Sequence, residues 1–134
     1  MAKSTIQFDA TNQCIILTFT GYVVGDEYRQ GFENLREAMI KNKVGNCLLD
    51  WTEKGISQKE DLTWLFEYWF PAVKKQIMEQ RNTRVNFAII HSKNVFADMT
   101  SQQAAKIGIQ KFGFHIEYFH DFKASFEWLK SKSK

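Results

Sequence analysis

A short apolar run that stops abruptly at a carboxylate constrains the fold of this chain most strongly. Residues 46–51 read Asn-Cys-Leu-Leu-Asp-Trp, and they follow a turn at residues 43–45. An apolar run this short between turn signals fits a strand buried on both faces better than a helix. Asp50 and Trp51 then lie at its carboxyl end, where open α/β sheets place their ligand or partner sites. We therefore expect a central parallel strand with a candidate site at its end.

Strand-like and helical patterns alternate along the rest of the chain. Strand-like runs are expected at residues 5–9, 14–20, 84–91 and 114–119, with a polar hairpin turn between the first two. Apolar residues recur at helical spacing in the segments between the later strands and after the last one. The order β-β-α-β-α-β-α-β-α predicts an α/β fold with a mostly parallel five-stranded sheet, right-handed crossovers and an antiparallel first edge strand.

Local signals predict where the helices begin and end. Residues 57–60 and 100–103 are capping boxes, in which a hydroxyl side chain and a later Glu or Gln satisfy two free amides. Pro71 lacks an amide hydrogen and disfavours helical angles at the preceding residue, so the helix from residue 57 is expected to kink or break there. Gly113 is predicted to end the third helix, and Asp121 to cap the last.

The composition is typical of one ordinary domain, so we expect a single domain over residues 1–134. The net charge of +3 is dispersed, which does not favour nucleic-acid binding. No apolar stretch is long enough to cross a bilayer and no signal-peptide pattern is present at the start, so a cytoplasmic protein is expected. Cys14 and Cys47 lack CxxC spacing and a histidine cluster, and neither a metal site nor a cofactor is predicted.

Five short groups of residues, spread over nearly the whole chain, carry a family resemblance: Gly21-Tyr22, Leu48-Leu49-Asp50-Trp51, Phe70-Pro71, Phe96-Ala97 and Trp128-Leu129. Together they resemble the SpoIIAA-like family, a branch of the STAS (sulfate transporter and anti-sigma-factor antagonist) fold that is related in shape to the lipid-binding SEC14 domains. The resemblance implies a non-catalytic regulatory or protein-interaction module.

STAS antagonists use a phosphorylatable hydroxyl residue just after the central strand, in an Asp-x-Ser arrangement at a helix amino end, where added charge changes docking to a partner. The matching positions here are Asp50, Trp51 and Thr52. The resemblance therefore implies Thr52 as a phosphoacceptor, although the large Trp51 departs from the antagonist pattern. Ordinary turn chemistry at a strand exit is the alternative role for Thr52.

Asp50 and His91 are expected at the carboxyl ends of neighbouring strands, a geometry that suits a general acid-base pair. No nucleophile elbow, phosphate-cradling glycine loop or HExxH spacing accompanies them. The stronger interpretation is that Asp50 caps local amides and that His91 lies on the surface. We predict no catalysis and keep an enzyme that uses Asp50 and His91 as the third alternative.

The segment 64–70 carries more aromatic side chains than one helix stripe can bury. A core stripe takes residues 65, 66 and 69, whereas Trp64 and Tyr68 lie one turn apart on another face. Phe96, Met99 or the loop after the central strand covers that face, or it forms a homodimer contact or a groove for an apolar small molecule or lipid. The predicted ligand or partner surface is Asp50, Trp51, Trp64, Tyr68, His91 and Phe96. An interaction module is favoured, with an apolar small-molecule or lipid carrier second.

Overall fold

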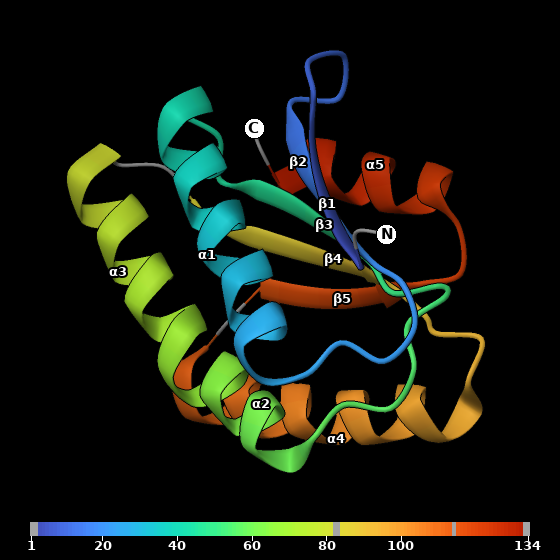
Figure 1. Cartoon of the computed structure of the whole chain (residues 1–134). Helices are drawn as coiled ribbons and strands as arrows, with labels where there is room; N and C mark the ends of the chain where they lie inside the picture. The colour runs from blue at the N-terminus through green and yellow to red at the C-terminus, as the bar shows by residue number, and fades with distance from the viewer. Residues whose placement is uncertain (1–2, 82–83, 114, 133–134) are drawn as a thin grey trace.

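Five strands form one mixed sheet in which the spatial order equals the chain order (Figure 1). The computed structural model describes residues 3–81, 84–113 and 115–132. The strands are β1 (Ser4–Asp9), β2 (Cys14–Phe19), β3 (Asn46–Asp50), β4 (Asn86–Ile90) and β5 (His115–Phe119). β1 pairs with β2 in antiparallel fashion, and the remaining pairs are parallel. The predicted α/β fold class, with its antiparallel first edge strand, is confirmed.

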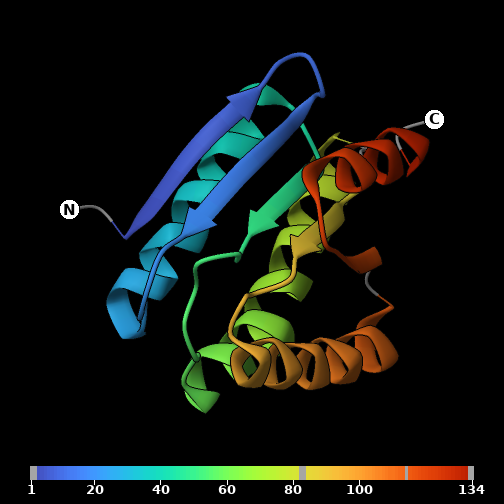
Figure 2. The ribbon, with the colours of Figure 1, turned by 90° about the vertical axis from the view of Figure 1, so that its right-hand side faces the viewer.

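Helices cover both faces of the sheet. They are α1 (Gly25–Asn42), α2 (Lys59–Trp64), the π-helical turn η1 (Leu65–Trp69), α3 (Phe70–Arg81), α4 (Val95–Phe112) and α5 (Phe122–Lys132). Figure 2 shows α1 and α3 on one side of the sheet and α5 on the other. α4 lies beside η1 and β5. The two central strands, β3 and β4, are therefore enclosed between helices, which explains their continuous apolar sequence.

Side-chain alternation divides the core into two parts. Leu17 and Leu49 point toward α1 and α3 and belong to the larger core, which also contains the rings of Phe66 and Trp69 in η1. Leu48 and Ala88 point the other way and pack with Leu129 of α5. All of these side chains are buried, as expected for a central strand covered on both faces.

Neither predicted capping box begins a helix, and both predictions are wrong. α2 begins at Lys59, and no side chain caps it. The Ser57 hydroxyl instead accepts a hydrogen bond from the ammonium group of Lys54. α4 begins at Val95, because the Asn94 side chain caps it by accepting a bond from the Ala97 amide at 3.0 Å. Residues 100–103 consequently lie inside α4.

Of the kink or break predicted at Pro71, the break is wrong, because α2, η1 and α3 follow one another without interruption. Phe70 keeps right-handed helical angles, with φ −59° and ψ −46°. The irregularity takes the form of the π-helical turn η1, directly before Pro71. A wider turn at this point accommodates a residue that has no amide hydrogen to donate.

The other two predicted helix signals are confirmed. Gly113 adopts the left-handed conformation, with φ 69°, and its amide donates to the Ile109 carbonyl at 2.8 Å. The Asp121 carboxylate accepts the Ala124 amide at 2.8 Å at the start of α5. Phe114, which was expected to open the last strand, lies outside the described residues.

A buried carboxylate fixes the start of α1 against α2. Asp61 is 1% exposed, and its Oδ2 accepts the Gly25 amide at 2.9 Å. The Nε atom of Arg29, one turn further along α1, lies 3.9 Å from the other carboxylate oxygen. A negative charge at the amino end of a helix is favourable, because that end carries unsatisfied amides and positive partial charge.

A buried ammonium group holds the loop between β3 and α2. Lys54 is 4% exposed, and its Nζ donates to the Gly55 carbonyl at 3.1 Å. The same atom lies 5.5 Å from the ring centre of Tyr28 and 5.4 Å from that of Trp51. Burial lowers the pKa of Lys54 to about 8, and the charge of Asp61 acts in the opposite direction.

We expect the substitution Lys54→Met to remove a pH dependence of stability. The folded protein releases the Lys54 proton near a pKa of about 8, whereas the unfolded chain holds it to about 10.5. The wild-type protein should therefore gain stability relative to the variant as the pH rises from 8 to 10.5, by on the order of 3 kcal/mol. Urea unfolding of both proteins across this range measures the difference. Parallel stability curves would contradict a buried, destabilised ammonium group.

Candidate functional site

Backbone hydrogen bonds join the loops that follow β2, β3 and β4. The Gly21 amide donates to the Glu53 carbonyl at 2.8 Å, and the Gly55 amide donates to the Gly21 carbonyl at 2.9 Å. The Lys93 amide donates to the Thr52 carbonyl at 3.0 Å. Figure 1 shows these loops together at the right of the sheet, where the carboxyl ends of its parallel strands lie. Three segments that are distant in sequence thus form one continuous edge.

Five exposed apolar side chains belong to the loops of this edge and to the first turns of α4, which follows the last of them. We define the carboxyl-edge surface as Tyr22, Ile56, Val95, Phe96 and Met99, each of which is between 40% and 71% exposed. Tyr22 also lines a hollow of about 270 Å³ whose other walls come from the loops after β3 and β4. The first turns of α4 bury mainly small side chains against the rest of the protein, which leaves the larger ones facing outward.

Asp50 and Thr52 form a local turn at the end of β3. The Asp50 Oδ1 atom accepts the Thr52 hydroxyl at 2.6 Å and the Thr52 amide at 3.2 Å. Both residues are half-buried. α2 begins only at Lys59, so the Thr52 hydroxyl does not lie at a helix amino end.

Trp51 does not belong to a surface, and its place in the predicted ligand or partner surface is wrong. Its side chain is 2% exposed and packs in the larger core. The physical reason is alternation: Trp51 follows Leu49 by two residues and enters the same core. The ammonium group of Lys54 closes over its ring.

His91 is held by α4 and β5 rather than by Asp50. Its Nδ1 donates to the Asp98 carboxylate, whose two oxygens lie at 2.9 and 3.0 Å. The Gln102 side chain donates to the same carboxylate at 2.7 Å. The imidazole stacks on that of His120, with ring centres 4.3 Å apart. Although their strands are neighbours, Asp50 and His91 engage different partners and do not form the acid-base pair that was considered from the sequence.

The second aromatic face of the α2–η1 segment is only partly covered. Trp64 is half-buried against Tyr28 and Phe32 of α1, with ring centres at 6.5 and 6.3 Å. The Arg29 guanidinium carbon lies 5.3 Å from the Trp64 ring centre. Tyr68 is 67% exposed. The rings that pack on Trp64 come from α1, whereas Phe96 and Met99, which together with the loop after Trp51 were one possible cover for this face, are themselves exposed.

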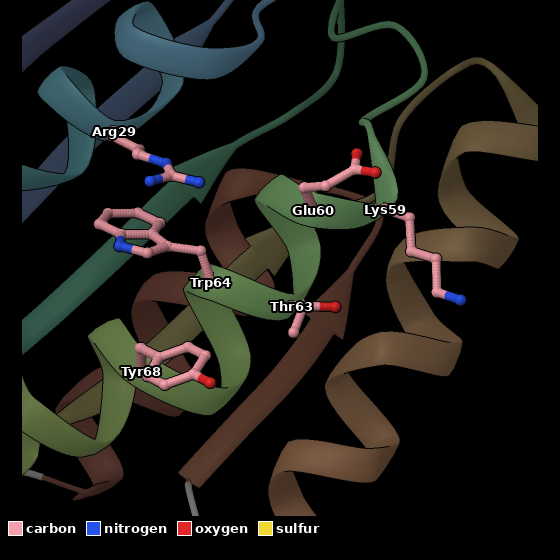
Figure 3. Close-up of a pocket in the computed structure, with 6 residues that line it drawn as sticks. All are labelled: Arg29, Lys59, Glu60, Thr63, Trp64 and Tyr68. Carbon is pink, nitrogen blue, oxygen red and sulfur yellow. The ribbon is translucent and has the colours of Figure 1, made fainter.

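A groove of about 600 Å³ follows this face. In Figure 3, Arg29 reaches from α1 over the indole of Trp64, and Tyr68 lies one turn further along. The residues that line the groove are Arg29, Lys59, Glu60, Thr63, Trp64 and Tyr68. Two aromatic rings beside a guanidinium group can receive an apolar or aromatic molecule that carries an acidic group.

Sequence reasoning missed Val95 and Met99 as surface residues. The signal that could have found them is Asn94, which is a favourable N-cap residue and lies six positions before the supposed cap at residue 100. Starting the helix at Val95 places the exposed side chains one turn apart at its amino end.

Within residues 3–81, 84–113 and 115–132, no group of three or more His, Cys, Asp or Glu side chains is arranged to hold a metal ion. Over the same ranges, no helix has the length and apolar character that crossing a membrane requires.

Comparison with known proteins identifies the fold. No protein-family model matches the chain, and no curated protein matches it in sequence. Among solved structures, the chain resembles the anti-sigma factor antagonist SpoIIAA in its unphosphorylated form, with a TM-score of 0.55, 7% identity and 96% coverage of both chains. It also resembles an anti-sigma factor antagonist from Mycobacterium paratuberculosis, with a TM-score of 0.57, 9% identity and coverage of 95% of this chain and 92% of the other.

A third structure comes from Shewanella loihica and is an uncharacterized protein of the DUF3478 family with a SpoIIAA-like fold. It matches with a TM-score of 0.57 and 16% identity, covering 94% of this chain and 91% of the other. These likenesses extend over nearly the whole chain, and they agree with the five-stranded mixed sheet and the alternating helices. The chain therefore has the SpoIIAA-like, or STAS-like, fold that the sequence resemblance implied.

Proposed function

We propose that residues 1–134 form one SpoIIAA-like domain that acts as a non-catalytic regulatory module and binds a protein partner through the carboxyl-edge surface. Two of the solved structures with this fold are anti-sigma factor antagonists, which supports a regulatory role. The observation that carries the proposal is that five apolar side chains are exposed on the segments that follow β2, β3 and β4, at one end of the sheet. Exposed apolar clusters of this kind mark protein-protein contacts.

The edge has the arrangement of an interface. Its apolar side chains stand beside a polar rim, in which the Lys93 ammonium group pairs with the Glu53 carboxylate at 2.5 Å. The hydrogen bonds between Gly21, Glu53 and Gly55 hold the loops in place before any partner arrives. Binding to such a surface costs little ordering entropy, which favours specific docking.

Thr52 is the phosphoacceptor in this proposal. Its side chain lines the same hollow as Tyr22 and Lys93, next to the carboxyl-edge surface. A phosphate there would add negative charge beside Asp50, whose carboxylate now accepts the Thr52 hydroxyl. Loss of that bond and like-charge repulsion would rearrange the turn and weaken docking. Mass spectrometry of protein from its native host, before and after phosphatase treatment, tests for the modification.

The groove beside Trp64 favours a second candidate function, that of a carrier for an apolar small molecule or lipid. Trp64 and Tyr68 supply apolar surface, and Arg29 supplies a cation for an acidic head group. A fatty acid combines these two chemistries. The exposed aromatic face can instead contact a second copy of this chain. Sedimentation velocity over a concentration series detects such a homodimer.

The double substitution of Val95 and Phe96 by Ser should weaken partner binding without unfolding the domain. Both side chains are more than 60% exposed, so stability should change by less than about 1 kcal/mol. Affinity for the partner should fall by about tenfold or more, since two apolar contacts are lost. The partner is first recovered from host-cell extract with the wild-type protein as bait. Calorimetric titration of that partner with the wild-type protein and with the double variant then measures the two affinities.

The matched control is Ile107→Ser, which removes another exposed apolar side chain from α4, outside the carboxyl-edge surface. This variant should bind the partner as the wild type does. Equal affinity of the double variant and the control would show that the partner does not dock on this edge.

Trp64 and Tyr68 should respond differently to substitution by Ser. Trp64→Ser should lower the free energy of unfolding by about 2 to 4 kcal/mol, because the indole packs on two buried rings of α1. Tyr68→Ser should change it by less than about 0.5 kcal/mol, because this side chain is exposed. Urea unfolding measures both. Titration with a fluorescent fatty acid then tests the carrier: weaker binding by Tyr68→Ser supports it, and equal binding by the wild type and Tyr68→Ser sinks it.

A further inference from the structure

Three polar side chains stand next to one another at the amino ends of β3, β4 and β5. Asn46, Asn86 and His115 are neighbours in the sheet register. Asn46 donates to the Leu129 carbonyl at 3.3 Å, and the Nδ2 of Asn86 donates to the Oδ1 of Asn46 at 2.9 Å. The Oδ1 of Asn86 lies 3.1 Å from the Nδ1 of His115. These hydrogen bonds form a row that runs from α5 across β3 and β4 to the edge strand β5.

This row fixes which nitrogen of His115 titrates. Because Asn86 uses its amide nitrogen toward Asn46, it presents its carbonyl oxygen to His115. A carbonyl oxygen only accepts, so the Nδ1 of His115 carries the hydrogen. The Nε2 atom is left as the site where a second proton binds. His115 is itself exposed and lines a hollow on the protein surface.

His115 lies among cations. Lys74, Arg84 and His115 line a hollow of about 270 Å³, and among the described residues that line it none carries a carboxylate. Desolvation, followed by the charges of Lys132, Lys74 and Arg84, lowers the pKa of His115. The imidazole is therefore neutral at neutral pH and faces a positive potential.

The neighbouring groups leave this potential in place. The Lys74 ammonium lies 3.3 and 3.4 Å from the carbonyl oxygens of Phe112 and Gly113, at the negative end of α4. It thereby shields the hollow from those carbonyls. An adjacent hollow of about 350 Å³ also has Lys74 in its lining. The carboxylate of Glu79 lines that second hollow together with the ammonium group of Lys75.

We propose that this amino-edge hollow, lined by Lys74, Arg84 and His115, binds a phosphate group, either as inorganic phosphate or as the monoester of a small molecule. The planar guanidinium of Arg84 can donate to two phosphate oxygens, and Lys74 supplies a point charge. His115 supplies a third donor when Nε2 takes up a proton. The hollow, at about 270 Å³, has room for a phosphate group and for the small organic part of a monoester.

The proposed site is independent of the proposed function. Figure 1 shows the amino ends of β4 and β5 at the left of the sheet, away from the loops of the carboxyl-edge surface. A substitution on one edge therefore tests that edge alone.

Phosphate titration followed by NMR tests the proposal, with the His115 imidazole signals as the readout. Added inorganic phosphate at constant pH and ionic strength should shift these signals saturably, and it should raise the pKa of His115, since the anion prefers the protonated ring. Arg84→Gln should weaken phosphate binding by about tenfold or more, because the bidentate contact is lost. The matched control is Lys106→Gln, which removes one exposed positive charge from α4 outside the hollow.

Phosphoserine, titrated in the same way, distinguishes the two sources of phosphate. Tighter binding of phosphoserine assigns the site to a monoester, and equal or weaker binding assigns it to inorganic phosphate. An unsaturable shift, the same shift with chloride, or equal binding by Arg84→Gln and Lys106→Gln would overturn the proposal. Circular dichroism of Arg84→Gln confirms that lost binding is not lost folding.

Discussion

The hydrogen bond between the buried Asp61 carboxylate and the Gly25 amide is the interaction on which the carboxyl edge depends. The carboxylate accepts the first amide of α1, from its own position in α2, and so joins two helices that belong to different crossovers. A carboxylate that is 1% exposed needs such partners, because an unpaired buried charge is strongly unfavourable. The Lys54 ammonium, which is also buried, provides an opposite charge in the same interior. Together the two groups fix the loop between β3 and α2 against α1.

The two edges of the sheet offer different chemistry because the parallel strands all run in one direction. At the carboxyl ends, loops held by backbone hydrogen bonds expose apolar side chains, which suits a protein partner. At the amino ends of β4 and β5, cations surround His115, which suits a small anion. The two proposals therefore place the protein partner on one side of the domain and the phosphate group on the other.

The strands and their order were predictable from sequence because β3 and β4 are buried on both faces and read as continuous apolar runs. The buried position of Trp51 was also within reach, since alternation from Leu49 places it in the same core. The start of α2 was not. Ser57 resembles a helix cap, but its hydroxyl accepts the Lys54 ammonium, and no local pattern encodes that contact.

The candidate site was predictable only in part, because contacts between distant segments are not encoded by local sequence patterns. Asp50 and His91 were correctly placed at the ends of neighbouring strands, but their partners follow from the turn that contains Thr52 and from the docking of α4, which carries Asp98. The amino-edge hollow was not visible in the sequence. Lys74, Arg84 and His115, which line it, come from three separate segments of the chain, and only the sheet register brings His115 beside Asn86.

Amide hydrogen exchange at Gly21, Gly55 and Lys93 tests the central claim most directly. Each of these amides donates to a carbonyl in another loop of the carboxyl edge. If the edge is a rigid surface held by Asp61, these amides should exchange at least ~100-fold more slowly than in an unstructured chain, and Asp61→Asn should remove that protection while leaving Leu49 protected. Unprotected exchange at the three amides of the wild-type protein would contradict the account.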